Sequence, residues 1–128
     1  MTTTPSVAPV VRDLTQAMID AYANASGDYN PIHIDEAFAR STPMGGTIAH
    51  GMLVLTLISE MMTAAFGAAW LTSGNLDVRF RAPARPGDRL TARARSGTQD
   101  GVHLKYAVEV VSQTDEVLIS GTAEVTPA

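Results

Sequence analysis

With 128 residues, the chain has the length of one folded domain, and we expect residues 1–128 to form it. The composition is 45% hydrophobic and 17% charged with a net charge of −4, and no basic run is present, which argues against nucleic acid as a partner. The absence of cysteine excludes disulfides and thiolate metal sites, and it agrees with a cytoplasmic location.

The N-terminal third predicts a helix followed by a loop. The stretch MTTTPSVAPVV has no positively charged start, so no signal peptide is predicted. A helix is expected from Thr15 to Ala25, with Thr15 as its N-cap and apolar residues at helical spacing. It ends at Ser26-Gly27, and Pro31 prevents it from resuming. A short helical turn is expected within Asp35 to Arg40.

The longest apolar run extends from Met52 to Leu71, interrupted by Thr56, Ser59, Glu60 and Thr63. A membrane span needs about 20 predominantly apolar residues, and an unpaired Glu60 at its middle would be costly, so no membrane partner is expected. From His50 to Leu71 the chain is apolar on nearly every side. This pattern predicts one helix enclosed by other structure.

The remaining third alternates apolar and polar residues with period two, which indicates strands. The predicted inward rows are Leu76, Val78 and Phe80; Leu90, Ala92 and Ala94; Val102, Leu104, Tyr106, Val108 and Val110; and Val117, Ile119, Gly121, Ala123 and Val125. Hairpin turns are expected at Gln99 to Gly101 and near Thr114. Helices followed by a strand meander indicate an α+β fold, with the sheet curled around the apolar helix.

The stretch SGDYNPIHIDEA, Ser26 to Ala37, places Asp28 and His33 five residues apart around a proline. Backbone turns favour Gly, Asp, Asn and Pro for conformational reasons alone. The histidine directly after such a turn is not explained in that way.

This stretch, followed by IAHGML at Ile48 to Leu53, resembles the MaoC-like hydratases, the (R)-specific enoyl-CoA hydratase and hydroxyacyl dehydratase family of the hot dog fold. The segments VRFRAPARPGDRL and GTAEV resemble later strands of the same family, so the likeness covers most of the chain from about Thr15. The N-terminus departs from the family, which usually has a longer first strand and a further Gly-Asp turn. The resemblance implies an antiparallel sheet wrapped around a long buried helix.

Carried over by position, the resemblance assigns Asp28 and His33 as the catalytic pair and Gly51 and Ser59 as substrate-binding residues. Chemistry agrees, because a carboxylate and an imidazole on one loop can share a water and carry out two proton transfers. Gly51 opens the long helix, where free N–H groups favour a developing oxyanion, and its missing Cβ leaves room for a thioester. Ser59 has an equally good structural explanation, since a helical serine often bonds the preceding turn.

The resemblance implies a lyase that hydrates trans-2-enoyl thioesters to (R)-3-hydroxyacyl thioesters, or runs the reverse dehydration. It implies no cofactor beyond the thioester carrier, coenzyme A or acyl carrier protein, and a homodimer formed by pairing sheet edges. Two alternatives are a hot dog acyl thioesterase and a subunit of a heteromeric dehydratase. Acyl length and the direction of the reaction are not encoded in these motifs.

Other polar residues have structural explanations that weigh against a chemical role. Ser26, Asn30 and Pro31 are expected to hold the loop, and His50 to support the start of the helix. His103 lies on the polar side of its strand and is expected to be solvated.

Three further kinds of site lack support in the sequence. His33, Asp35 and His50 could be drawn together around a metal, but no metal-ligand spacing supports this and no metal site is predicted. A nucleophilic serine lacks the G-x-S-x-G elbow, and Gly45-Gly46 lacks the Lys-Ser/Thr of a phosphate loop.

The sequence also suggests two contacts with the substrate. The arginines Arg79, Arg81, Arg85 and Arg89 could meet a coenzyme A phosphate, although a solvated sheet face explains them equally well. Some of the bulky residues Met61, Met62, Phe66 and Trp70 are expected to limit the depth of the acyl pocket.

Overall fold

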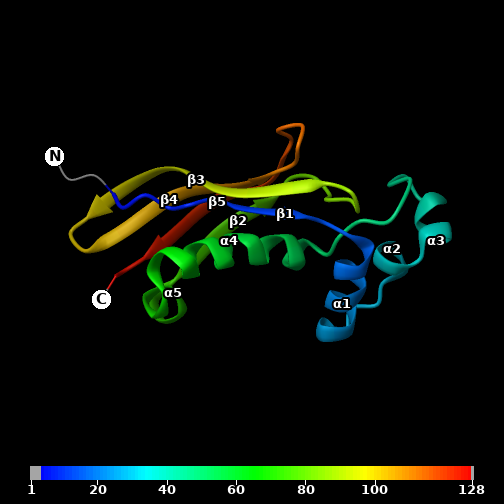
Figure 1. Cartoon of the computed structure of the whole chain (residues 1–128), viewed down its shortest axis with the longest axis horizontal. Helices are drawn as coiled ribbons and strands as arrows, with labels where there is room; N and C mark the ends of the chain where they lie inside the picture. Colours follow the sequence, from blue (N-terminus) through cyan, green and yellow to red (C-terminus); the bar gives the residue numbers. More distant parts are fainter. Residues whose placement is uncertain (1–3, 128) are drawn as a thin grey trace.

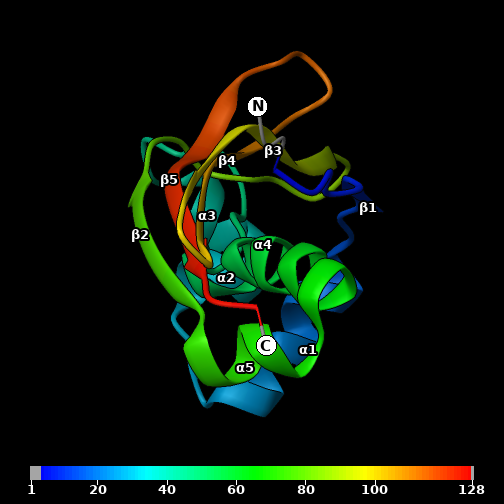
Figure 2. The ribbon, with the colours of Figure 1, turned by 90° about the vertical axis from the view of Figure 1, so that its left-hand side faces the viewer.

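The computed structural model describes residues 4–127 and shows a five-stranded antiparallel sheet curled around one long helix (Figures 1 and 2). The sheet order is β1-β3-β4-β5-β2. The elements in chain order are β1 (Val10–Asp13), α1 (Gln16–Ser26), α2 (Pro31–Ile34), α3 (Glu36–Arg40), α4 (Gly51–Phe66), α5 (Ala68–Ser73), β2 (Asn75–Phe80), β3 (Arg89–Asp100), β4 (His103–Val111) and β5 (Val117–Val125). The prediction of no signal peptide rests partly on residues 1–3, which lie outside the described residues.

The central strands form the predicted meander. β3 and β4 are joined by a tight turn at Gly101-Val102, and β4 and β5 by a turn in which Asp115 has a φ of 62°. Val102 is therefore part of the turn and 70% exposed, so its assignment to an inward row was wrong. A register shift between Ala94 and Ser96 marks a bulge in β3, which bends a long strand and helps the sheet to curl.

The core lies between α4 and the inner face of the sheet. Ile58, Met61 and Met62 of α4 are fully buried, and they meet the inward rows of β3, β4 and β5. Each such side chain contributes roughly 1.5–3 kcal/mol through removal of apolar surface from water. The predicted rows are confirmed apart from Val102 and Val117, which pairs with Val111 beyond a register shift and lies outside the core. Phe80 lies on the inner face beside Ile119, but it is 54% exposed at the end of edge strand β2.

The apolar run does not form one helix from His50 to Leu71. α4 ends at Phe66 because Gly67 adopts a φ of 58°, and α5 then begins at Ala68. The prediction of an enclosed helix is also wrong for its outer side, since Met52 is 56% and Leu71 73% exposed. Within residues 4–127, no helix is long and apolar enough to cross a lipid bilayer.

The helices α1, α2 and α3 gather at the end of the molecule opposite the chain termini (Figure 1). α1 is confirmed: the Thr15 side chain accepts a hydrogen bond from the Met18 N–H, and Gly27 closes the helix with a φ of 77°. α3 is confirmed within Asp35 to Arg40, with Asp35 as its N-cap. α2 was not anticipated, although Asn30 followed by Pro31 is a suitable start for a helix.

Candidate active site

Three consecutive side-chain contacts shape the loop between α1 and α2. The Asp28 N–H donates to Ser26 Oγ at 3.2 Å, and the Asn30 N–H donates to Asp28 Oδ1 at 3.2 Å. The Ile32 N–H then donates to Asn30 Oδ1 at 3.1 Å. These contacts confirm that Ser26 and Asn30 hold the loop, and they leave Asp28 Oδ2 directed elsewhere.

His33 is held by its ring and by its backbone. Nδ1–H donates to the Ile48 carbonyl at 2.8 Å, and since a carbonyl only accepts, Nε2 of the neutral ring carries a lone pair. The side-chain amide of Gln16 donates to the His33 carbonyl at 2.8 Å. The His33 side chain is only 12% exposed, whereas that of Asp28 is 53% exposed.

The structure brings the predicted catalytic pair together. His33 Nε2 and Asp28 Oδ2 lie 3.8 Å apart. This distance is too long for a direct hydrogen bond, but one water oxygen could lie about 2.8 Å from both atoms. The pair is therefore arranged to hold one water between two proton acceptors.

A polar network supports the loop that leads into α4. Thr47, which is 3% exposed, donates through Oγ1 to Gln16 Oε1 at 2.7 Å and also lies 3.1 Å from Glu36 Oε2. The Thr47 N–H donates to the same carboxylate at 3.3 Å, and Arg40 Nε donates to Glu36 Oε1 at 3.0 Å. These donors, the Thr47 N–H first, lower the pKa of Glu36.

Gly51 is the first residue of α4, where N–H groups lack partners within the helix. Glycine at this position has a different structural explanation from the expected one, which was room for a thioester. A Cβ there would lie 2.9 Å from Cε1 of Phe80, so the Phe80 ring occupies that space. Glycine is thus required for packing against β2, and Gly51 itself is exposed at the helix start.

Ser59 lies two helical turns beyond Gly51, about 12 Å along the helix axis at 1.5 Å per residue. Its Oγ accepts a hydrogen bond from the Trp70 indole N–H at 3.0 Å. The structure therefore does not bring Ser59 into contact with Asp28 or His33. A substrate-binding role for Ser59 would concern the acyl portion of a substrate and not the reacting atoms.

His50 is the neighbour that the sequence interpretation undervalued. Its ring stacks on that of His33, with centroids 3.8 Å apart and an angle of 23° between the planes. Its Nε2–H donates to the carbonyl of Asp28 at 3.0 Å. The sequence pattern that could have indicated a role for His50 is the His-Gly pair at the start of the apolar helix. That role depends on a contact between distant segments, which the pattern does not show.

The cluster of candidate metal ligands consists of Asp28, His33 and His50, whose ligand atoms lie within 4.8 Å of one another. Asp35 is not part of it, because its carboxylate caps α3. Imidazole lone pairs lie in the ring plane, so two stacked rings hold them in roughly parallel planes, which is unfavourable for binding one ion. Each ring also donates one N–H to a carbonyl, and the arrangement therefore favours acid–base chemistry.

The other residues considered lie apart from this site. His103 is 44% exposed and contacts Thr126 Oγ1, as expected of a solvated side chain. Arg89 is paired with Asp13 across the β1–β3 edge, which removes it from the arginines free to meet a phosphate and lowers the pKa of Asp13. Met61 and Met62 are ordinary core residues with no exposed surface.

Two hollows lie near α4 and the loop before it, and neither is lined by Asp28 or His33. An apolar cavity of about 30 Å³ lies between β1, α1 and α4, lined by Arg12, Leu14, Met18, Leu53, Val54, Thr56, Leu57 and Leu90. An open hollow of about 240 Å³ lies beside the loop before α4, lined by Glu36, Gly45, Gly46, Thr47, Arg85 and Pro86. In the single chain, the Asp28 side chain is 53% exposed to solvent.

Residues 2–117 of the chain match the protein-family model described as "MaoC like domain". The (R)-specific enoyl-CoA hydratase of Rhodospirillum rubrum is 33% identical over 85 residues, which cover 66% of this chain and 59% of that protein. The mitochondrial 3-hydroxyacyl-[acyl-carrier-protein] dehydratase of Arabidopsis thaliana is 33% identical over 110 residues, which cover 82% of this chain and 65% of that protein. The matched segments thus span less than two thirds of either relative.

Among solved structures, the (R)-hydratase of A. caviae is similar over 98% of both chains, with a TM-score of 0.81 and 25% sequence identity. Together with the sheet curled around α4, this likeness identifies the hot dog fold that the sequence motifs implied. The polar loop with Asp28 and His33 lies at one end of α4 in this fold.

Proposed function

The chain belongs to the MaoC-like domain family, and from this premise we propose that it is a lyase acting on acyl thioesters. The reaction is hydration of a trans-2-enoyl thioester to an (R)-3-hydroxyacyl thioester, or the reverse dehydration. The observation that carries the proposal is the Asp28 carboxylate 3.8 Å from a His33 Nε2 whose lone pair is free. Relatives with this activity in their names support it.

The chemistry follows from two acceptors around one water. The water donates one hydrogen bond to His33 Nε2 and one to Asp28 Oδ2, and one of these groups takes a proton as the oxygen bonds to C3 of the enoyl group. The electron pair moves onto the thioester oxygen. The same site then delivers a proton to C2, so that H and OH have added across the double bond.

The developing negative charge on the thioester oxygen needs a donor in the site. We assign this role to the Gly51 N–H at the positive end of the α4 dipole, with α4 long enough, at 16 residues, to have such a dipole. Ser59, two turns further, is proposed to line the path of the acyl chain. No cofactor takes part in these steps, and the thioester carrier is coenzyme A or acyl carrier protein.

The proposed enzyme is a homodimer in the cytoplasm, with residues 1–128 forming one hot dog domain. β1 and β2 are edge strands, and proteins usually pair or cover such edges. Pairing at the six-residue β2 would bring a second copy beside Phe80 and Gly51, where the single chain leaves the site open. A stable monomer in sedimentation at micromolar concentration would exclude this arrangement.

The purified chain, assayed alone with crotonyl-CoA, tests the function. We expect the absorbance of the conjugated enoyl thioester to fall while no free thiol appears, with a chiral assay giving the (R)-3-hydroxy product. Thiol release would identify a thioesterase instead. Activity that appears only with a second type of chain would identify a subunit of a heteromeric dehydratase, and a screen of chain lengths would define the acyl group.

A further inference from the structure

We propose that His50 is a positioning residue that sets the geometry of both Asp28 and His33. The side chain of His50 contacts both residues, through a hydrogen bond to the Asp28 carbonyl and by stacking on the His33 ring. It is 3% exposed, and on another side it packs against Tyr22 of α1, with centroids 4.8 Å apart. The kinetic arm of the test rests on the proposed function, whereas the spectroscopic arm does not.

The two contacts constrain different degrees of freedom. The hydrogen bond from Nε2–H to the Asp28 carbonyl fixes the backbone from which the catalytic carboxylate extends. The stacked ring, 3.8 Å from His33, prevents the His33 imidazole from tilting out of the plane in which Nδ1–H meets the Ile48 carbonyl. Together they maintain the gap of 3.8 Å that would hold the water.

A role only in starting the helix does not explain this histidine. His50 is the N-cap residue of α4, but its side chain makes no capping hydrogen bond. Its Nδ1 is buried without a hydrogen-bond partner, which is unfavourable for a polar atom. A phenylalanine of similar shape would pack there without that cost, so the histidine is explained by the hydrogen bond of its other nitrogen.

Two substitutions at this position separate the contacts. His50→Phe keeps a flat ring for stacking and removes the donor to Asp28, whereas His50→Gln keeps an N–H donor and removes the ring. We expect kcat for crotonyl-CoA to fall about 10-fold or more in each variant with little change in KM, because small displacements of a catalytic group cost much of the rate. His103→Phe is the matched control, with an expected kcat within a factor of two.

A spectroscopic measurement tests the same inference without turnover. The ¹⁵N shifts of the His33 ring report which nitrogen carries the proton, and we expect the Nδ1–H form of wild type to be mixed with other forms in both His50 variants. If folded His50 variants keep both wild-type kcat and the wild-type His33 shifts, His50 is only structural and the proposal is wrong. If wild type lacks hydratase activity, the proposed function fails, and the shifts still decide the positioning role.

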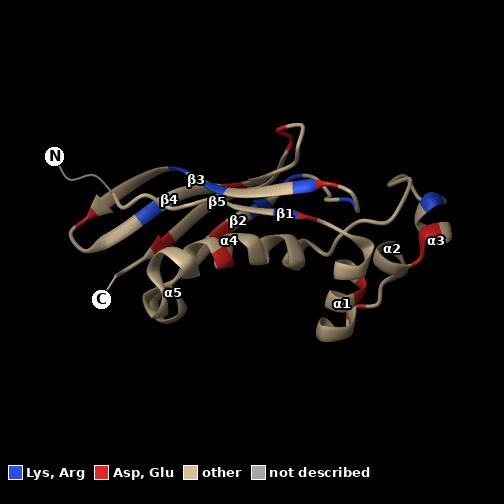
Figure 3. Cartoon of the chain, in the orientation of Figure 1, with Lys and Arg blue, Asp and Glu red and all other residues tan. Residues whose placement is uncertain are grey.

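A second, independent observation concerns charge. Residues 4–127 contain all nine Lys and Arg residues of the chain, and six of them lie within 4.0 Å of a carboxylate: Arg12, Arg40, Arg89, Arg93, Arg95 and Lys105. The three for which the structure shows no such ion pair, Arg79, Arg81 and Arg85, all belong to β2 and the loop that follows it. Lys and Arg are spread over the sheet and α3 (Figure 3), but in this chain of net charge −4 those without such an ion pair are grouped in β2 and the loop after it.

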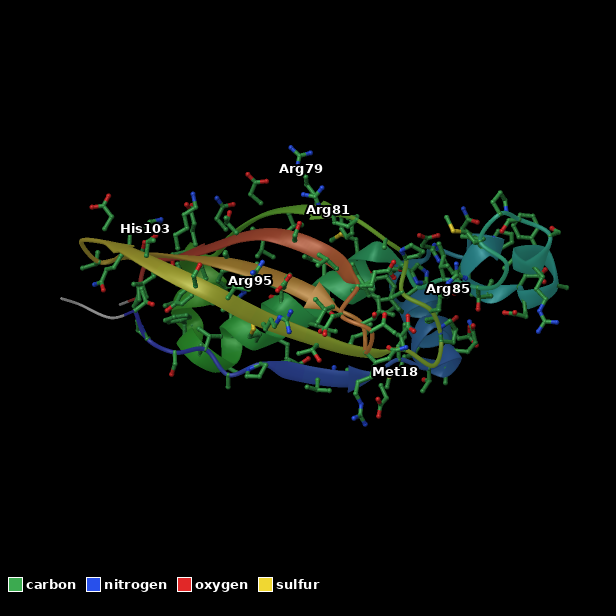
Figure 4. All side chains as sticks on the ribbon, turned by 90° about the horizontal axis from the view of Figure 1, so that it is seen from above. Met18, Arg79, Arg81, Arg85, Arg95 and His103 are labelled. Atoms are coloured by element: carbon green, nitrogen blue, oxygen red, sulfur yellow. The ribbon has the colours of Figure 1, made fainter. Side chains whose placement is uncertain are left out.

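Two of these arginines flank Phe80, the residue that packs against Gly51 of the candidate active site. Phe80, which lies between Arg79 and Arg81, packs against Gly51, and neighbouring strand residues point to opposite faces. Figure 4 shows Arg79 and Arg81 extending beyond the β2 edge of the sheet, away from Arg95. Pairing of β2 edges would use in-plane backbone groups, so the outer-face side chains would remain accessible in the proposed dimer.

We infer that Arg79 and Arg81 bind phosphate on the carrier of the thioester substrate. This inference rests on the proposed function. Arg85, which lines the 240 Å³ hollow beside the loop before α4, extends the same positive surface toward the helical end of the molecule. Guanidinium groups suit phosphate because they offer several fixed donors, and a local positive surface raises the encounter rate with an anionic substrate.

The test compares a carrier that has phosphate with one that does not. For the double variant Arg79→Gln/Arg81→Gln we expect KM for crotonyl-CoA to rise on the order of 5-fold and to depend less on salt. KM for the phosphate-free crotonyl-N-acetylcysteamine thioester should stay within a factor of two. Arg95→Gln is the matched control, because it removes the same charge from a side chain 68% exposed while Arg93 still pairs with Glu109.

Each result has a defined meaning. A larger KM change with crotonyl-acyl carrier protein than with crotonyl-CoA would identify the protein carrier as the source of the phosphate. Equal changes with and without phosphate, or a change only in dimer dissociation, would overturn the inference and assign the arginines to the dimer contact, with Asp77 of a second copy as their partner. If wild type turns over neither thioester, the proposed function fails, and calorimetry with coenzyme A alone compares wild type with the variant.

Discussion

The sheet with α4 and the helical region from α1 to the loop before α4 are stabilised in different ways. Of the nine largest fully buried side chains, only Ile19 lies in the helical region, and the other eight belong to α4 and the strands. The helical region is held instead by side chains bonded to backbone groups, such as Asn30 to Ile32 and His33 to Ile48. The proposed catalytic groups, Asp28 and His33, therefore lie where hydrogen bonds, and not apolar packing, determine position.

This difference predicts that substitutions in the two regions will separate rate from stability. The largest expected effect is on the rate. Asp28→Asn and His33→Asn should each lower kcat by at least ~10²-fold with little change in KM, because each removes one acceptor of the shared water. The double variant should be scarcely worse than the poorer single variant, since the two groups act as a unit.

Stability should be nearly unchanged in Asp28→Asn, because Asp28 is 53% exposed and asparagine preserves its size. His103→Asn is the surface control, with turnover expected within a factor of a few. Steady-state kinetics with crotonyl-CoA and a thermal melt of each variant make the comparison. Near-full hydration by a folded Asp28→Asn variant would show that the motif here is only a turn.

The acyl pocket gives a smaller expected change, in substrate preference. Phe66, the last residue of α4, is partly buried against Tyr106. Trp70 of α5 is 6% exposed and donates a hydrogen bond to Ser59, so both side chains lie near the C-terminal half of α4. Shortening Phe66 or Trp70 to alanine should extend chain-length tolerance in at least one case. Turnover of enoyl-CoA substrates of increasing chain length measures this tolerance. An unchanged chain-length preference in stable variants of both residues would contradict a role for them in limiting the pocket depth.

In the core, a conservative substitution should affect stability alone. Ile58 is fully buried on α4, and Ile58→Val removes one methyl group from a packed site. We expect a loss of about 0.5–1.5 kcal/mol in the free energy of unfolding, measured by denaturant titration, with kcat of the folded enzyme unchanged. A parallel loss of kcat would mean that core and site are more tightly coupled than the packing indicates.

The smallest expected effect depends on pH and concerns Glu36. Its pKa is lowered from 4.5, mainly by the Thr47 N–H, so ionised Glu36 stabilises the folded state above pH 4.5. That stabilisation disappears as the pH falls through the lowered pKa of the folded state. Glu36→Gln should therefore be less stable than wild type at pH 7, and the difference in melting temperature should shrink below pH 4.5; a difference independent of pH would contradict this.

The sequence by itself determined the elements whose signals are local. Thr15 and Gly27 mark the ends of α1 through backbone geometry, and the alternating strands were recognised because a half-buried sheet repeats every two residues. The loop motif also placed Asp28 and His33 within one short segment, so their proximity needed little information from elsewhere. The break at Gly67 was missed because an apolar run continues across it, and glycine alone does not reveal its φ of 58°.

Contacts between distant segments were decided only by the tertiary structure. The ring of His50 meets His33 seventeen residues away because the loop before α4 folds back onto α2, and no local pattern encodes that return. Gly51 and Phe80 likewise meet because the last residue of β2 lies beside the start of α4. Whether a histidine is solvated like His103 or stacked like His50 depends on which surfaces meet, and long-range packing settles that while periodicity and turn chemistry do not.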